Sequence, residues 1–144
     1  MTRIKSARGA AIIEVALTLP LLLLVSVGIV EFGRAYQTQQ VLTNAAREGA
    51  RVAVLPVQPA GAVQARVTQY LTAGQIANPS KATVTVAATQ ISLGGGSTAP
   101  GSKVTVTYPY SFMVLQPVAR LVVSGSKVGQ SITMTAVVEM RNEQ

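Results

Sequence analysis

One carboxylate, Glu14, stands near the start of an apolar stretch, and its position is the first feature that could do chemistry. The chain reads Arg8-Gly9-Ala10-Ala11-Ile12-Ile13-Glu14 and then stays mostly apolar to Val30. An acidic residue at the centre of a membrane segment costs about 2.5–3.5 kcal/mol on insertion scales, and less near the edge. Glu14 is therefore either an interfacial residue that fixes the depth of the segment or a charge that has a partner.

The junction between Gly9 and Ala10 suggests such a partner. If the chain is cut after Gly9, the new α-amino group of Ala10 and the Glu14 carboxylate could pair between adjacent subunits in a low-dielectric bundle. The cut would fall before the apolar run, on the cytoplasmic side. A conventional signal peptidase would instead cut after the run, and Ser26-Val27-Gly28 offers a small-x-small site that would leave a chain starting near Ile29. The apolar run is longer than a usual signal, and the helical pattern continues past Gly28.

The composition excludes the common catalytic and metal sites. Among its 144 residues the chain has no Cys and no His, and its five acidic residues are all Glu. A zinc site, a Ser-His-Asp triad and a Cys-His pair are therefore ruled out. We expect a protein that is not an enzyme, with no cofactor, no metal and no small-molecule substrate.

The net charge of +7 does not indicate nucleic-acid binding, because of how the charges are distributed. Arg3, Lys5 and Arg8 precede the apolar run, and the other basic residues are scattered without interleaved aromatics. Residues 10–30 would span roughly 30 Å as a helix, the thickness of a hydrocarbon core. The positive-inside rule then keeps the N-terminus cytoplasmic. Pro20 predicts a kink, which membrane helices tolerate.

The helical pattern continues over residues 31–55 and carries a face of small side chains. The residues of this face are Ala45, Ala46, Gly49, Ala50 and Ala53. Such a face allows a helix or a sheet to approach closely. It either packs on the domain of the chain itself, which we expect for this half of the helix, or meets another helix.

Residues 56–144 are predicted to form a small α+β domain. Pro56–Pro59 breaks the helix, residues 62–73 predict a short second helix, and residues 77–80 form a loop. Apolar residues then alternate in three segments, which predicts an antiparallel sheet of about three strands. The first strand shifts phase near Gln90, which indicates a bulge or a bend. The Gly-rich stretch 94–101 is expected to be a loop.

Two further features of this domain concern prolines. Pro109 lies in the second alternating segment, where it argues for an edge position or a distortion. Pro117 could open a short helix within the apolar stretch 116–123.

Tyr108, Tyr110 and Phe112 are interpreted as packing residues rather than as a ligand platform.

Four stretches carry a resemblance to a known family: Arg8-Gly9-Ala10-Ala11-Ile12-Ile13-Glu14, Leu19-Pro20-Leu21, Glu31-Phe32-Gly33-Arg34-Ala35 and Asn44-Ala45-Ala46-Arg47-Glu48-Gly49-Ala50-Arg51. Together they resemble the TadE-like family, the minor pseudopilins of the tight-adherence (Flp) type IV pilus system. The resemblance is close over residues 8–55 and holds only in outline beyond them. It implies a type IV pilin-like fold, with one long helix packed on the small sheet and one short extra helix.

The resemblance also implies a division of the chain and a set of partners. Residues 1–9 would be a leader removed by a prepilin peptidase, residues 10–30 a transmembrane segment, residues 31–55 its extracytoplasmic continuation, and residues 56–144 the periplasmic or extracellular domain. Glu14 would guide assembly or recognition. The partners would be the lipid bilayer, the prepilin peptidase, other pilins or pseudopilins and inner-membrane assembly proteins. The place would be the bacterial inner membrane, in a single pass, or the pilus itself.

The alternative is a signal-anchored periplasmic binding or structural domain that is never assembled into a pilus. The arginines of the long helix leave a similar choice open. Arg34, Arg47 and Arg51 are either solvated, with Glu31 and Glu48 as local partners, or in contact with another pilin.

Overall fold

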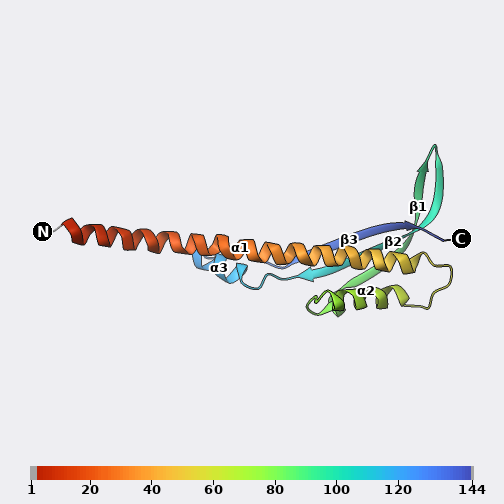
Figure 1. The fold of residues 1–144 in the computed structure, drawn as a ribbon, viewed down its shortest axis with the longest axis horizontal. Helices are drawn as coiled ribbons and strands as arrows, with labels where there is room; N and C mark the ends of the chain where they lie inside the picture. Colours follow the sequence, from red (N-terminus) through yellow and green to blue (C-terminus); the bar gives the residue numbers. More distant parts are fainter. Residues whose placement is uncertain (1–2, 144) are drawn as a thin grey trace. The chain divides into compact units, whose positions relative to one another are not determined.

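A single long helix forms the N-terminal part of the chain. The computed structural model describes residues 3–143, and for residues 3–8 and Val122 it describes the backbone but not the side chains. Helix α1 runs over Arg3–Ala53, so the apolar stretch and the Ala- and Gln-rich stretch behind it are one helix, as predicted (Figure 1). The helix runs through Pro20 without a break. Residues 1 and 2 of the predicted leader lie outside the described residues.

The described residues form two compact units. Unit 1 contains the chain up to Ala35 together with residues Ser111–Ser131, and unit 2 contains Tyr36–Tyr110 together with the residues from Ile132 onward. Unit 1 holds the first part of α1 and helix α3, Leu115–Val122. Helix α3 forms in the stretch where Pro117 was expected to allow a short helix. The proline lies in the first turn of α3, where its missing N–H costs no hydrogen bond.

Unit 2 holds a three-stranded antiparallel sheet of order β1-β2-β3. The strands are β1 (Thr83–Gly94), β2 (Ser97–Tyr110) and β3 (Ile132–Arg141). The alternating side chains on one face of β2 and β3 are buried: Val104, Val106, Tyr108, Tyr110, Met134 and Ala136. The α+β fold with a three-stranded sheet is therefore confirmed.

The last part of α1 and helix α2, Ala62–Ala73, complete the core of unit 2. Helix α2 buries Val63, Val67 and Leu71, and α1 buries Leu42 and the whole predicted small-residue face. A Cβ placed on Gly49 would lie 2.7 Å from Val67 Cγ2 and 3.4 Å from Val104 Cγ1. The small face therefore lets α2 and the sheet approach α1 closely, as expected for packing within the chain. A short 3₁₀ helix, Pro79–Lys81, lies in the predicted loop 77–80.

The predictions for the β1–β2 hairpin were wrong in two details. Residues 97–101 belong to β2 instead of a loop, and only Gly95 and Gly96 form the turn after Gly94, the last residue of β1. All three glycines have φ between +60° and +88°. Of the two alternatives near Gln90, the bulge is misplaced, because the irregularity in register lies between Ser92 and Gly94. The distal hairpin is a two-stranded ribbon that projects from unit 2, so most of its side chains are exposed and its residue types give no burial pattern (Figure 1).

Pro109 lies in the central strand, yet the expectation of an edge position has a physical basis. β2 pairs with β1 only as far as Thr107, which faces Thr83. Pro109 pairs with Thr133 of β3 alone. At this position β2 has one neighbouring strand, so the missing N–H of Pro109 interrupts no ladder on the β1 side.

Candidate membrane and assembly site on helix α1

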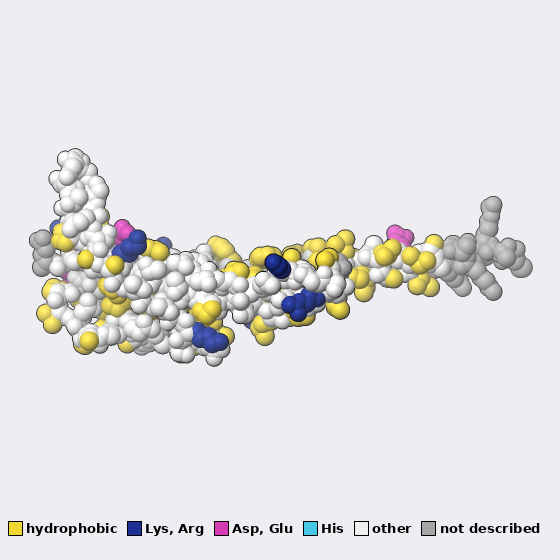
Figure 2. Space-filling model, turned by 180° about the vertical axis from the view of Figure 1, so that it is seen from behind, with side chains coloured by type: hydrophobic (Ala, Val, Ile, Leu, Met, Phe, Trp, Pro, Cys, Tyr) yellow, Lys and Arg dark blue, Asp and Glu magenta, His cyan; other side chains and the backbone are white. Residues whose placement is uncertain are grey.

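The first part of α1 carries apolar side chains that the described residues leave uncovered. The helix is long and apolar enough to cross a membrane, with a mean hydropathy of 2.4 over its most apolar window and none of that window buried. Figure 2 shows these side chains gathered along the helix. The large exposed ones are Ile12, Ile13, Val15, Leu17, Leu19, Leu21, Leu22, Leu23, Val25, Ile29 and Val30. A soluble surface rarely carries so long an apolar segment, so this part of α1 needs lipid or another helix around it.

The predicted junction residues and Glu14 all lie on this exposed part of the helix. Gly9, Ala10 and Glu14 are exposed, and a Cβ placed on Gly9 would meet nothing within 4 Å. The junction lies inside α1, about one helical turn before Glu14. Glu14 is the one ionisable residue between Gly9 and Val30. The structure thus places an ionisable group on an apolar helix next to an accessible peptide bond.

The other polar side chains of the apolar segment are satisfied by the helix itself. Thr18 Oγ1 donates to the backbone oxygen of Glu14 at 2.9 Å, and Ser26 Oγ donates to that of Leu22 at 2.8 Å. Hydroxyls that bond back to the preceding turn expose no unpaired donor to lipid. The carboxylate of Glu14 cannot be satisfied in this way, because a helix offers no free donor in its interior.

A second glutamate, Glu31, is buried, whereas Glu14 is exposed, and the sequence alone did not reveal this burial. Its side chain is 2% exposed, and Oε2 accepts a hydrogen bond of 2.8 Å from the backbone N–H of Met113. Arg34 Nη1 lies 3.3 Å from Oε1, which is the local pairing named as one of the two alternatives for Arg34. The ring of Phe32 meets that of Phe112 edge to face at 5.8 Å between centroids. Glu31 and its neighbours therefore fasten the chain before α3 to α1 within unit 1.

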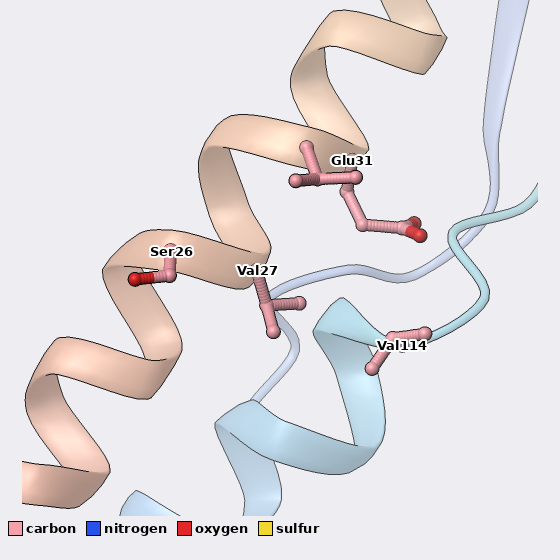
Figure 3. A pocket seen from close by; sticks show the side chains of 5 residues that line it. Ser26, Val27, Glu31 and Val114 are labelled. Atoms are coloured by element: carbon pink, nitrogen blue, oxygen red, sulfur yellow. The ribbon is translucent and has the colours of Figure 1, made fainter.

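A groove lies beside Glu31, between α1 and the start of α3. It has a volume of about 250 Å³ and is lined by Ser26, Val27, Val30, Glu31 and Val114. Figure 3 shows Val27 and Val114 facing each other across it, while the Ser26 hydroxyl points away. Because the Glu31 carboxylate is engaged by Met113 and Arg34, the groove offers an apolar surface rather than a charged binding site.

The charged residues near the C-terminal end of α1 make polar contacts on the surface of unit 2. Glu48 accepts hydrogen bonds from Arg66 Nη2 at 2.8 Å and from Arg51 Nη1 at 3.2 Å. The hydrogen bond from Arg66, more than the nearby charge of Arg51, holds the pKa of Glu48 below its usual value, although partial desolvation opposes it. Arg47 bonds to Asn44 instead of Glu48. These contacts are those of a solvated helix surface.

The comparisons with known proteins identify the segment that carries these features. A family model described as TadE-like protein matches residues 9–51. No curated protein matched the chain, and no solved structure did. TadE-like proteins are structural proteins of pili rather than enzymes, and the apolar helix near the N-terminus fits a membrane-anchored component of a tight-adherence pilus. The chain is thus similar to TadE-like proteins over residues 9–51, which contain the junction, Glu14 and most of α1.

Proposed function

We propose that this protein is a minor pseudopilin that takes part in the assembly or initiation of a tight-adherence pilus. A prepilin peptidase cuts after Gly9, and Ala10 becomes the N-terminus. The Glu14 carboxylate then pairs with the α-amino group of Ala10 on an adjacent subunit or is recognised by the assembly machinery. The chain is not an enzyme and needs no cofactor.

One observation carries this proposal. The Glu14 carboxylate lies about one helical turn after the accessible Gly9–Ala10 bond, on the uncovered apolar part of α1. The other end of the same helix is packed into unit 2. The apolar side chains around Glu14 are exposed, whereas Ala45, Ala46 and Ala50 are fully buried in unit 2. A single helix thus holds an anchor, an ionisable group and a domain. The TadE-like match covers residues 9–51, which include the apolar anchor and Glu14 and end before the domain of residues 56–144.

The proposal assigns a role to each part of the chain. Residues 1–9 form the leader, residues 10–30 cross the membrane, residues 31–55 continue the helix outside the cytoplasm, and residues 56–144 form the extracytoplasmic domain. The basic leader keeps the N-terminus in the cytoplasm, which leaves the domain in the periplasm or at the pilus. The partners are the lipid bilayer, the prepilin peptidase, other pilins or pseudopilins and the inner-membrane assembly proteins.

The small-residue face packs within the chain and is not proposed as a contact with another pilin. Ala45, Ala46, Gly49, Ala50 and Ala53 are all buried in unit 2, so this face is used within the chain. Contacts with other pilins would fall on the exposed part of α1 before Ala35. There close approach depends on Ala10, Ala11 and Gly33 rather than on the face in unit 2.

The role of Glu14 is tested with two substitutions at that position and one control. Glu14→Ala removes the carboxylate, and Glu14→Gln keeps its shape without its charge. We expect both variants to insert in the membrane as the native protein does, and to reduce the yield of surface pili strongly. Ser26→Ala removes a hydroxyl that bonds only within its helix in the described contacts, and should leave pili unchanged.

The readouts are membrane fractionation and the yield of sheared pili. If both Glu14 variants assemble pili at the native level, Glu14 is only an interfacial residue and the assembly role is wrong. The alternative is an anchored periplasmic domain that is not assembled. It would be favoured if the native protein is retained in the membrane and a strain without the gene still makes pili normally.

A further inference from the structure

Helix α3 presents two different apolar surfaces. Leu115, Val118 and Ala119 are buried in unit 1. Val114 and Leu121 are exposed, as is Pro117, and the three recur at the helical spacing i, i+3, i+7 on another side of the helix. The first surface is used for packing within unit 1. The second, which we call the α3 stripe (Val114, Pro117 and Leu121), is apolar and uncovered by the described residues.

The position of α3 along α1 gives the depth of this stripe. Phe112 packs against Phe32, and the Leu115 side chain lies 4.0 Å from the place of a Cβ on Gly28. The chain thus moves about one turn toward the N-terminus of α1 as it enters α3. Val114 lines the same groove as Ser26 and Val27. The start of α3 is therefore level with residues 26–32, where the uncovered apolar part of α1 ends.

The chain after α3 turns back at the same level. A Cβ on Gly129 would lie 2.6 Å from the backbone nitrogen of Gln116, so this glycine brings the returning chain against the start of α3. Val123 and Val128 are exposed on the way. The only charged residues between Ser111 and Ser131 are Arg120 and Lys127, so the segment is apolar and cationic.

We propose that residues 111–131 form an interfacial element that rests in the outer boundary of the bilayer crossed by α1, with the α3 stripe in contact with lipid. This inference rests on the proposed anchoring of α1. The exposed apolar side chains of α1 continue into the stripe at one level, so a single apolar environment covers both. Arg120 and Lys127 match the phosphates of anionic headgroups, as in other interfacial helices.

The depth of the element follows from its backbone. Residues 123–131 are not helical, and irregular backbone is not tolerated where it faces the hydrocarbon core. The element therefore lies at the boundary between headgroups and acyl chains, where amphipathic helices bury their apolar face about 5–10 Å deep. The groove beside Val27 and Val114 opens at this level and is filled by lipid chains. Unit 1 thereby contacts the membrane through residues 111–131 as well as through α1.

The absence of cysteine makes the test direct, because a single introduced cysteine carries the only label. The full chain with Leu121→Cys is labelled with a nitroxide and reconstituted in vesicles of phosphatidylcholine and phosphatidylglycerol. Leu121 is 81% exposed, so the change disturbs no core. Leu22→Cys, on the exposed part of α1, is the reference for the membrane, and Ser97→Cys, on the exposed hairpin, is the reference for water. Val123→Cys gives a second position on the element.

Collision rates with oxygen, which concentrates in lipid, and with a water-soluble nickel chelate are measured for each label. We expect the labels at positions 121 and 123 to collide more often with oxygen and less often with nickel than the label at position 97. Compared with the label at position 22, they should collide less often with oxygen and more often with nickel. Nickel contact at position 121 equal to that at position 97, with position 22 protected, would overturn this inference and leave the anchoring intact.

Two other outcomes would also overturn it. If the label at position 22 is itself open to nickel, the anchoring of α1 fails, and this inference fails with it. If the label at position 121 is shielded from both collision partners, protein rather than lipid covers the stripe, and the occupant is another copy or another pilin.

Discussion

The backbone N–H of Met113 donates a hydrogen bond of 2.8 Å to the Oε2 of Glu31, which precedes it by 82 positions. The carboxylate is nearly inaccessible and also faces Arg34 Nη1 at 3.3 Å. A backbone donor on a buried carboxylate makes a charge-assisted bond, which is stronger than a neutral one. This contact holds residues 111–131 on α1 and sets the level at which α3 begins.

The first prediction concerns this contact. Glu31→Ala leaves the Met113 N–H and the Arg34 guanidinium without the carboxylate, and we expect a loss of about 1–3 kcal/mol in the stability of unit 1. The amide of Met113 should exchange its hydrogen correspondingly faster, measured by hydrogen exchange with mass spectrometry on the full chain in detergent. Glu31→Gln, which keeps an acceptor oxygen, should lose less.

A surface carboxylate provides the control for that substitution. Glu139 pairs with Lys103 at 3.3 Å while both side chains remain exposed, so Glu139→Ala should change stability by less than about 1 kcal/mol. If Glu31→Ala and Glu139→Ala have equal effects on exchange at Met113, Glu31 does not hold the segment.

A second prediction uses two glycines of the same helix. Gly49→Val places side-chain atoms where Val67 Cγ2 already lies, 2.7 Å from the first added carbon, and we expect a loss of about 1–3 kcal/mol from overpacking. Gly33→Ala has open space around it and should instead stabilise the helix by about 0.5–1 kcal/mol. Urea unfolding followed by circular dichroism measures both. A neutral Gly49→Val would show that α1 and α2 pack more loosely around Gly49 than the 2.7 Å contact implies.

A third prediction is a dependence on acidic pH through Glu48. Because hydrogen bonding to Arg66 lowers the pKa of Glu48, the folded state gains stability above the unfolded value of about 4.3. That gain is lost as the pH falls through the lower folded value. Glu48→Gln should therefore flatten the decline of stability below about pH 4.3, by a small amount because the site is solvated. An equal change from Glu139→Gln would mean that Glu48 has no particular role.

A fourth prediction concerns Tyr108, whose hydroxyl donates to the backbone oxygen of Ala77. Tyr108→Phe should lower the free energy of unfolding by about 0.5–1.5 kcal/mol. Burial raises the pKa of Tyr108, so its contribution is present below about pH 10 and decreases as the pH rises past that value. Tyr108→Phe should abolish this alkaline decline, measured by urea unfolding across pH. Tyr36→Phe, at an exposed position, should change neither quantity.

Local patterns in the sequence predicted most of the fold. The continuous helix follows from residues that favour helix and from the absence of proline between Pro20 and Pro56, and the sheet follows from alternation in β2 and β3. The hairpin tip was harder, because Ser97 and Thr98 pair with strand β1 while facing solvent. A strand with both sides exposed has no apolar alternation by which to be recognised.

The candidate site was predicted in part. Glu14 and the junction are local in sequence, so their order was visible, and their roles remain predictions. The burial of Glu31 depends on Met113 and Phe112, which meet α1 only through the fold. In the sequence, Arg34 stands three residues after Glu31, and this spacing was interpreted as an ion pair on the helix surface. Nothing in that spacing indicated that Glu31 is buried. The apolar run 113–115, beside no charged residue, was the one signal that this segment lies against another apolar surface.

The most direct test of the account is the intact mass of the mature protein purified from membranes of cells that make the pilus. Gly9→Leu is the control, because a side chain at this open position disturbs no contact but blocks a site that needs a small residue. We expect the native chain to begin at Ala10 and the Gly9→Leu chain to keep its leader. A native chain that begins at Met1, or near Ile29 as signal peptidase would leave it, would contradict the account.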